Sequence, residues 1–351
     1  MKFRAELEPL RPYVPPKSWR TAAEGKDENG YAKLTSNELA FGPLPEAEAA
    51  ISEVLARANR YPDSHASRFR KAIADANAGS EPANVLVGNG SSEVLLNALQ
   101  LLPGGGEVVY PWPSFSLYPT LCAVLGMTAR PVPLTKQGEI KPEALLSAVG
   151  PETRAVILCN PNNPSGSYLT LDRVRELAGE LPDSVLLIVD EAYVEFIDDP
   201  AYENSHALAL ETENVVVART FSKAHGLAGL RAGYGIAPER IADYAERVRF
   251  PFSVNLVAQV AATASMLAQD KVRERAEFVI RERKRLQEAF ERARLDFMPS
   301  QGNFVMVRFE ADDFERSGVL VREGAALGYP GWSRVTVGNS EENDRVIKAL
   351  G

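Results

Sequence analysis

The residue best placed to do chemistry is Lys223, which lies in a run of small and apolar residues, 220–231, that holds no acidic side chain. Ser222 precedes it and Arg231 follows. Residues 214–218 predict a buried strand, so Lys223 is expected where the sheet ends and the chain turns. Most lysines serve solubility on the surface. An amine in a crowded, apolar place loses its proton more easily and becomes a nucleophile. These surroundings therefore favour a lysine that forms a Schiff base with an aldehyde.

A glycine- and serine-rich turn, residues 88–93, follows another predicted strand and opens a predicted helix. Backbone amides at a helix N-terminus bind anions, and the helix dipole adds to the attraction. The turn is therefore a candidate phosphate site. A dinucleotide-binding fingerprint would need a third glycine where Glu93 stands. A plain turn with a helix cap is the remaining alternative.

Two further polar motifs also follow predicted strands. Residues 160–166, Asn-Pro-Asn-Asn-Pro-Ser-Gly, combine prolines that fix a turn with asparagines that offer amide donors, although a simple loop is the alternative. Asp190 ends the apolar run 185–189 and needs a cationic or hydrogen-bonding partner if it is buried. A protonated pyridine nitrogen is one such partner, and Tyr193 is close enough in sequence to reach the phenolic oxygen of the same ring. A helix-capping aspartate is the alternative.

The combination of motifs is more informative than any one of them. Phe115 follows a further strand end and has a ring that could stack on a flat ligand, with core packing as the alternative. The phosphate turn, the asparagine loop, Asp190 and Lys223 come in chain order, each just past a strand. Ser222 and Arg231 add phosphate ligands near the lysine. Together these residues predict pyridoxal 5′-phosphate as the cofactor.

The elements that must position these motifs alternate along the chain. Helix-like segments are expected at 45–58, 66–78, 91–102, 115–125, 141–149 and 170–180. Short apolar runs, predicted to be strands, occupy residues 85–88, 107–110, 129–132, 155–158, 185–189 and 215–217. Continuous apolar strands separated by helices predict an α/β domain with a largely parallel sheet covered on both faces. Ligands then bind at the carboxyl ends of the strands.

The sequence character divides the chain into three parts. Residues 1–35 are proline-rich and are expected to form an irregular arm that packs on the small domain or on a partner. Residues 36–250 hold the alternating pattern of the large cofactor-binding domain. In residues 251–351, a charged, helix-rich segment (254–293) precedes two strand-like runs, 304–307 and 334–337, each followed by helical sequence. This order predicts a smaller α+β domain, and the charged run is expected to be a solvated helix face.

Composition limits the function classes. The chain has 351 residues and a net charge of −8, which argues against nucleic acid or an anionic membrane as partner. The first residues lack an apolar signal core, and no run of 18 apolar residues occurs. Cys122 and Cys159 lie in apolar runs and indicate neither a disulfide framework nor a metal site, so we expect a cytoplasmic protein. The three histidines are unpaired at ligand spacing, so no metal is expected.

On residues 160–166, 190–193 and 222–233, the chain resembles the fold-type I, aspartate-aminotransferase-like family of pyridoxal-phosphate enzymes, and within it the histidinol-phosphate aminotransferase group. The likeness extends over nearly the whole chain. It includes residues 10–13, 36–38, 60–62, 300–304 and 334–338.

The resemblance implies roles for individual residues. Lys223 would form the Schiff base, Asp190 would pair with the pyridine nitrogen, and Asn163 and Tyr193 would hold the phenolic oxygen of the ring. Phe115 would stack on the ring. The phosphate would be held by Gly90, Ser91, Ser92, Ser222 and Arg231.

It also implies how substrate is bound. Tyr61 would reach into the site of a neighbouring subunit, so a homodimer with shared sites is expected. Arg334 would bind the substrate carboxylate through its planar guanidinium. Tyr13, Asn37 and Arg322 would line the far end of the substrate pocket. The reaction implied is transfer of an amino group from a small-molecule donor to 2-oxoglutarate.

Substrate identity has several alternatives. The first hypothesis is conversion of histidinol phosphate and 2-oxoglutarate to imidazole acetol phosphate and glutamate, in histidine biosynthesis. However, residues 41–45 and 112–119 are similar to actinobacterial aromatic (phenylalanine) aminotransferases, and residues 37–40 and Ser165 depart from the common family pattern. A threonine-phosphate decarboxylase is another alternative. So is a non-catalytic regulator or binding protein with this fold, although the chain has no basic patch or spare length for a DNA-binding domain.

Overall fold

A large mixed sheet forms the body of the molecule. The structure is a computed structural model and describes residues 1, 4–8, 10–16 and 30–351; the remaining residues of the expected arm lie outside the described ones. The sheet order is β2-β8-β7-β6-β5-β3-β4. Only β8 is antiparallel, to both β2 and β7, and the other neighbours pair in parallel. Its strands are β2 (Val85–Asn89), β3 (Glu107–Trp112), β4 (Thr128–Pro133), β5 (Thr153–Cys159), β6 (Leu186–Asp190), β7 (Val215–Thr220) and β8 (Ala232–Ile236).

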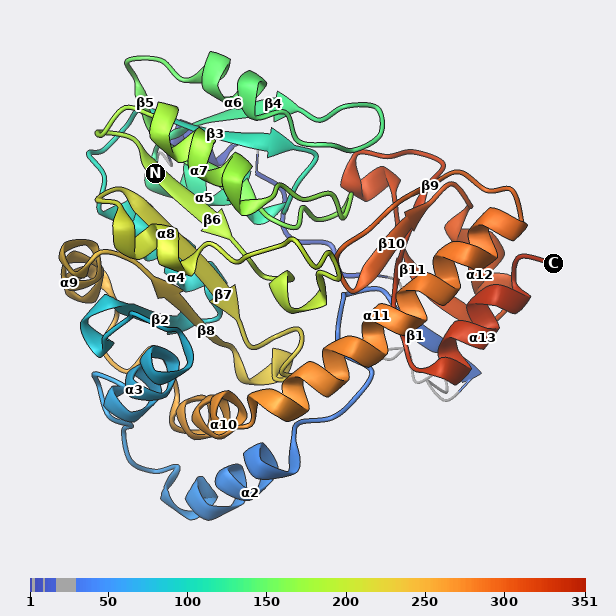
Figure 1. Cartoon of the computed structure of the whole chain (residues 1–351), viewed down its shortest axis with the longest axis horizontal. Helices are drawn as coiled ribbons and strands as arrows, with labels where there is room; N and C mark the ends of the chain where they lie inside the picture. The colour runs from blue at the N-terminus through green and yellow to red at the C-terminus, as the bar shows by residue number, and fades with distance from the viewer. Residues whose placement is uncertain (2–3, 9, 17–29) are drawn as a thin grey trace.

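Helices cover both faces of this sheet (Figure 1). The helices are α2 (Pro45–Val54), α3 (Ser67–Ala76), α4 (Ser91–Gln100), α5 (Leu117–Leu125), α6 (Pro142–Ala148), α7 (Leu171–Glu180), α8 (His206–Glu211) and α9 (Glu239–Val248). Successive strand residues point to opposite faces. In β6, Leu187 and Val189 therefore pack with α3, α6, α7 and α8, whereas Leu186 and Ile188 pack with α4, α5 and α9. Burial on both faces explains why the strands read as continuous apolar runs.

A smaller sheet lies beside the large one, with order β1-β11-β12-β10-β9. Its strands are β1 (Ala32–Leu34), β9 (Phe297–Met298), β10 (Phe304–Val307), β11 (Val319–Glu323) and β12 (Ser333–Thr336). The later helices are α10 (Leu256–Leu267), α11 (Gln269–Arg292), α12 (Ala311–Arg316) and α13 (Ser340–Lys348). Short 3₁₀ turns occupy Ala5–Leu7, Leu55–Arg57, Pro82–Asn84, Val194–Phe196, Ala228–Leu230 and Ala325–Leu327. In Figure 1, α11 runs from α10 toward this sheet.

The eight predicted strands and the predicted helices are confirmed, but four strands were missed: β1, β8, β9 and β11. The expectation of irregular chain up to residue 35 is wrong for Ala32–Leu34, which pairs in parallel with β11. Ala32 and Leu34 are buried and Lys33 between them is exposed. Three residues of alternation are too few to stand out from a proline-rich surrounding. Pairing with β11 at the edge of the sheet, rather than the local sequence, therefore determines that these residues form a strand.

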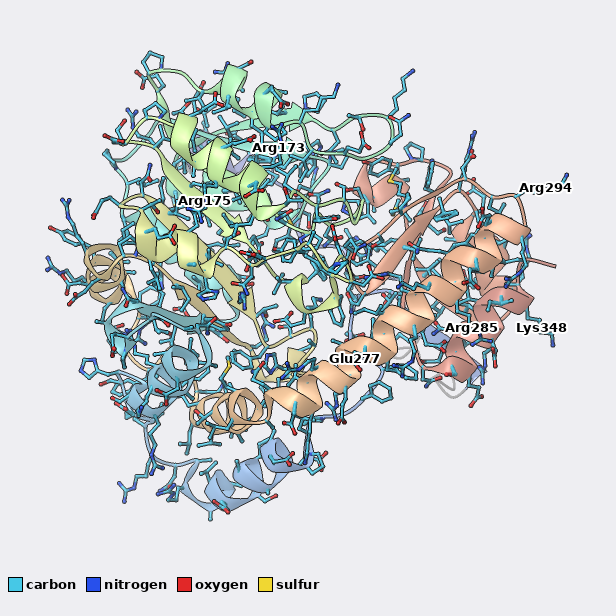
Figure 2. All side chains as sticks on the ribbon, viewed as in Figure 1. Arg173, Arg175, Glu277, Arg285, Arg294 and Lys348 are labelled. Atoms are coloured by element: carbon cyan, nitrogen blue, oxygen red, sulfur yellow. The ribbon has the colours of Figure 1, made fainter. Side chains whose placement is uncertain are left out.

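The region after residue 250 is divided between the two sheets. Helix α10 packs on α2 and α3, and α11 continues from it to β10. The division of the chain at residues 250 and 251 stays a prediction. The charged run of α11 is mainly a solvated face: Glu277, labelled in Figure 2, and Arg281 are both exposed. Arg283 is the exception: it is buried, donates to the carbonyls of Phe196 and Gly302 at 2.7 and 3.0 Å, and so ties α11 to the loop after β6.

Among the described residues, no helix combines the length and the apolar character that crossing a membrane requires.

Strand β8 was missed because it contains Gly233 and Gly235, which are unfavourable in strands. The structure shows why Gly233 is needed. A Cβ atom there would lie 2.2 Å from the amide nitrogen of Ser91 and 2.3 Å from the carbonyl carbon of Gly90. The strand must therefore approach the start of α4 without a side chain.

We predict that Gly233→Ala lowers the free energy of unfolding by roughly 1–3 kcal/mol, because backbone atoms have to move to admit the methyl group. Gly179→Ala is the matched control: it lies in α7 with nothing within 4 Å of the added Cβ. There alanine should stabilise by about 0.5 kcal/mol through helix propensity. Urea unfolding measures both values. Equal stability of the two variants would contradict the tight approach of β8 to α4.

Candidate active site

A cavity of about 260 Å³ lies at the carboxyl ends of β5, β6 and β7. The chain order of the motifs predicted such a site, because carboxyl ends of parallel strands meet at one edge of the sheet. The structure brings most of the expected cofactor-binding residues together here. Those that line the cavity are Ser91, Ser92, Phe115, Asn163, Asp190, Tyr193, Ser222, Lys223 and Arg231.

Lys223 follows β7 and turns its amine toward the loop before α2. Nζ donates to the carbonyl oxygens of Ser36 at 3.2 Å and Asn37 at 2.9 Å. Burial, together with the nearby positive charge of Arg334, lowers the pKa of Lys223 to about 7. Glu38 opposes this shift by raising the pKa. A large fraction of the amine is therefore neutral and nucleophilic near pH 7.

Asp190 also lines the cavity and is 1% exposed. Burial raises its pKa to about 6, while a hydrogen bond from Tyr118 opposes the rise. Tyr118 Oη donates to Oδ2 at 2.9 Å, and Oδ1 is buried without a hydrogen-bond partner. Such an atom calls for a donor that the chain itself does not supply. A protonated ring nitrogen fits this position.

Tyr118 is a site residue that sequence reasoning missed. It lies near the start of α5, three residues after Phe115, and within the predicted helix 115–125 that spacing would place both residues on one face. The two rings are in edge contact with centroids 5.7 Å apart. That spacing was the available signal. The contact with Asp190, which joins residues 72 apart in sequence, had no local signal.

The glycine- and serine-rich turn connects β2 to α4, as predicted from the sequence, and its binding of phosphate stays a prediction. Gly90 has φ of 78° and precedes the first residue of α4. A Cβ on Gly90 would lie 2.4 Å from Nη2 of Arg231, so only glycine lets this guanidinium approach. Arg231 Nη1 donates to Ser222 Oγ at 3.0 Å. A helix N-terminus, serine hydroxyls and a guanidinium together fit a phosphate group.

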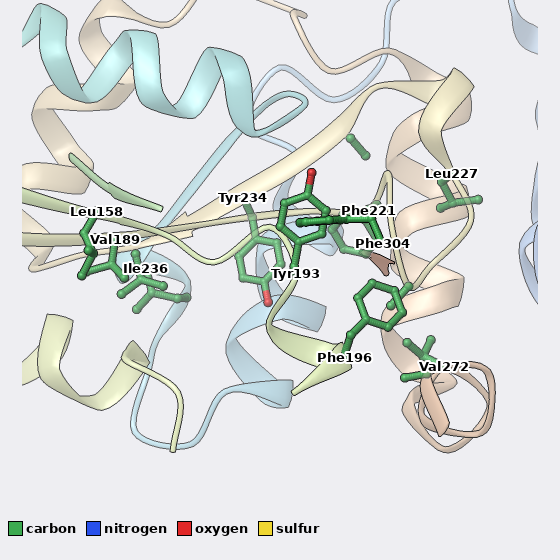
Figure 3. Close-up of a cluster of buried hydrophobic side chains, with 14 of the residues drawn as sticks. Leu158, Val189, Tyr193, Phe196, Phe221, Leu227, Tyr234, Ile236, Val272 and Phe304 are labelled. Carbon is green, nitrogen blue, oxygen red and sulfur yellow. The ribbon is translucent and has the colours of Figure 1, made fainter. Parts of the chain in front are cut away.

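Tyr193 is held by two amides. Its Oη accepts from Asn163 Nδ2 at 3.0 Å and from Asn37 Nδ2 at 3.2 Å. These donors occupy the acceptor sites of the phenol, so its own proton is left to donate to a ligand oxygen. The ring of Tyr193 lies beside that of Phe304 (Figure 3). The two ring centroids are 5.1 Å apart. Asp190 Oδ1, the phosphate turn and this hydroxyl match the nitrogen, phosphate and phenolic oxygen of pyridoxal 5′-phosphate.

A second cavity adjoins the first, and the expected substrate residues line it. Arg334 Nη1 donates to Asn163 Oδ1 at 2.7 Å and Nη2 donates to Thr35 O at 2.8 Å, while Nε is buried without a partner. Its lining includes Tyr13, Asn37, Arg322 and Arg334, and also Phe115, Tyr193 and Lys223. The two cavities therefore share the amine and the aromatic wall.

The second cavity is cationic. Arg322 in β11 and Arg334 in β12 are directly opposite each other in the strand register. Like charges at such a pair are destabilising. No carboxylate occurs among the described residues that line this cavity. The arrangement therefore suits an anionic ligand that lies between the two guanidinium groups.

Tyr61 is the predicted site residue that the structure does not bring to the site within one chain. It is 81% exposed and stacks on Phe252 with ring centroids 4.5 Å apart. It is not among the described residues that line either cavity. Its expected role in a neighbouring subunit stays a prediction.

Comparison with known proteins decides the family. The model of the family "Aminotransferase class I and II" matches residues 29–350. This chain belongs to that family. The predicted fold-type I architecture and the prediction of a pyridoxal-phosphate-dependent transaminase are thereby confirmed.

Several relatives of this aminotransferase are similar over most of their length. A histidinol-phosphate aminotransferase of Rubrobacter xylanophilus is 67% identical over 351 residues, which cover the whole of both chains. An aromatic amino acid aminotransferase of Cutibacterium acnes is 41% identical over 323 residues, 91% of each chain. Among solved structures, the histidinol-phosphate aminotransferase of Sinorhizobium meliloti in complex with pyridoxal-5′-phosphate has a TM-score of 0.88 at 29% identity, covering 99% of this chain and 96% of the other.

We predict that the reactivity of Lys223 in the cofactor-free aminotransferase rises with pH to a plateau, with a midpoint near 7, because only the neutral amine attacks an aldehyde. Arg334→Gln should move the midpoint up, since a positive charge that favours the neutral amine is removed. Glu38→Gln should move it down. Reductive methylation by formaldehyde, followed at Lys223 by peptide mass spectrometry, measures the midpoints. A wild-type midpoint near 10, the ordinary lysine value, would contradict the desolvated amine.

Proposed function

We propose that this aminotransferase converts histidinol phosphate and 2-oxoglutarate to imidazole acetol phosphate and glutamate, in the cytoplasm and as part of histidine biosynthesis. The similarity to the Rubrobacter enzyme over the full chain supports this choice. The observation that carries it is the pair of opposed arginines, Arg322 and Arg334, in a cavity without an acidic residue among those described.

The arginine pair distinguishes between candidate substrates by charge. A phosphate monoester carries close to two negative charges near pH 7, and 2-oxoglutarate carries two carboxylates. Two guanidinium groups can neutralise either partner, so one cavity serves both halves of the reaction. Phenylalanine offers one carboxylate and an apolar ring. With phenylalanine bound, one of the two arginines would have no anionic partner.

The residues of the chain have separate tasks in this reaction. Pyridoxal 5′-phosphate supplies an aldehyde and an electron-withdrawing ring when bound. Asp190 Oδ1 would hold the proton of the ring nitrogen, and Tyr193 would donate to the phenolic oxygen. Once its amine is free, Lys223 Nζ would take the proton from the α-carbon of the substrate and return it at C4′ of the cofactor.

Aromatic amino acid transamination is the second candidate. Tyr13 and Phe115 line the same cavity as the arginines and could contact an aromatic ring. The Cutibacterium relative carries that name. Under this alternative Arg334 would bind the α-carboxylate, and Arg322 would have no role in the amino-donor half-reaction.

We also propose that the enzyme is a homodimer in which Tyr61 contributes to the site of the other subunit. Tyr61 and Phe252 are 81% and 37% exposed and stack on each other, and exposed apolar side chains that lie together mark an interaction surface. The stack of Tyr61 on Phe252 fixes the direction of the tyrosine. A monomeric holoenzyme in sedimentation experiments would contradict this proposal.

We predict that, with 2-oxoglutarate as acceptor, kcat/KM for histidinol phosphate is more than tenfold higher than kcat/KM for phenylalanine. In single turnovers with the donor alone, Arg322→Gln should slow histidinol phosphate about 10- to 100-fold, because a charge-assisted hydrogen bond is worth roughly 1.5–3 kcal/mol. Phenylalanine should change less than threefold. Arg316→Gln, an exposed arginine at the end of α12, is the matched control. A tenfold preference for phenylalanine would reverse the assignment.

A further inference from the structure

The loop between β1 and α2 connects the small sheet to the reactive amine through Asn37. This residue has φ of 53°, in the left-handed region that asparagine tolerates better than most residues. Its backbone N–H donates to Thr336 Oγ1 at 2.9 Å, and the hydroxyl of Thr336 donates to Asn37 Oδ1 at 3.2 Å. One hydroxyl at the end of β12 thus binds both the main chain and the side chain of Asn37.

Two further side chains, Asn303 and Arg334, donate hydrogen bonds to carbonyl groups of the loop. Asn303, just before β10, donates through Nδ2 to the carbonyl oxygen of Asn37 at 3.1 Å. Arg334 holds the carbonyl of Thr35. Asn37, Asn303 and Thr336 are 1%, 0% and 3% exposed, so water does not compete for these hydrogen bonds. The small sheet therefore fixes the position of the loop.

The loop in turn holds the amine of Lys223. A neutral amine has two N–H groups and one lone pair. The carbonyls of Ser36 and Asn37 accept from Nζ, which accounts for both N–H groups. The lone pair is then left for a proton or an electrophile in the cavity. A backbone shift at Asn37 would turn the lone pair away from the reacting atoms.

The same strand also carries the substrate-binding candidate. Arg334 and Thr336 are two residues apart in β12, so their side chains leave the same face. Arg334 lines the cationic cavity, whereas Thr336 binds Asn37. An anion bound at Arg334 would therefore restrain the strand that sets the carbonyls around Lys223.

We propose that Thr336 is a positioning residue for Lys223: its hydroxyl fixes Asn37 in the left-handed conformation in which the carbonyls of Ser36 and Asn37 hold both N–H groups of Nζ. This proposal rests on the proposed role of Lys223 as the group that moves the α-proton. It assigns no contact with substrate or cofactor to Thr336 itself.

The test compares Thr336→Val, which removes the hydroxyl at nearly constant volume, with Thr336→Ser, which keeps it. Thr153→Val is the matched control: Thr153 is also buried, and its hydroxyl accepts from Gly150 N–H at the start of β5, away from the site. Two quantities are measured. One is hydrogen exchange at the Asn37 amide in the cofactor-free protein. The other is the rate of α-proton transfer from histidinol phosphate in single turnovers of the holoenzyme, with the dissociation constant of the donor.

For Thr336→Val we expect exchange at Asn37 to be at least tenfold faster and proton transfer to be about tenfold slower, with the dissociation constant within twofold of wild type. Misplacement of a reacting group by about 1 Å can cost as much as a hundredfold in rate. Thr336→Ser and Thr153→Val should both stay within twofold of wild type. If Thr336→Val does not fold, Thr336→Ala should give the same pattern.

Faster exchange at Asn37 with an unchanged rate of proton transfer would overturn the proposal, because Thr336 would then be purely structural. Unchanged exchange would overturn it as well, since the hydroxyl would not be holding the loop. Failure of the proposed function is distinguishable. In that case wild-type holoenzyme itself would transfer no α-proton from histidinol phosphate, whatever residue stands at position 336.

Discussion

Removal of the Lys223 amine from water is the constraint on which the site depends. Burial disfavours the charged amine and lowers its pKa to about 7. A buried amine still needs partners for its N–H groups. Those partners are backbone carbonyls of a loop that begins at the small sheet. The reactivity of one side chain just after β7 of the large sheet thus requires the small sheet to be in place.

The carboxylate of Asp190, which lines the same cavity, has a complementary requirement. Asp190 is buried with one oxygen bound by Tyr118 and the other without a partner. An unsatisfied carboxylate oxygen in a dry site costs free energy, and a ligand with a matching donor removes that cost on binding. The opposed Arg322 and Arg334 leave a second unfavourable arrangement that an anion relieves. Part of the free energy of ligand binding therefore comes from relief of these two unfavourable arrangements.

Sequence alone was sufficient for the parts of the site that are local in the chain. Each of Asp190, Lys223 and the turn at Gly90 follows an apolar strand, and parallel strands bring their carboxyl ends together. The resemblance to a known family added Arg334 and Asn37. Sequence was insufficient where the signal is not local. The glycines of β8 are explained only by the approach of α4, and the carbonyl of Asn37 meets an amine 186 residues away. Backbone contacts of this kind have no side-chain pattern.

The most direct measurement of the central claim is borohydride reduction of the holoenzyme followed by peptide mass spectrometry. Lys223 should carry the reduced pyridoxyl group, and Lys223→Ala should carry none. Lys33→Ala is the control. Lys33 lines a neighbouring cavity, and that cavity shares the lining residues Glu38 and Ser222 with the site. The Lys33→Ala variant should be labelled at Lys223, as the wild-type enzyme is. Labelling of any other lysine in the wild-type enzyme, or an intact covalent link in Lys223→Ala, would contradict the account.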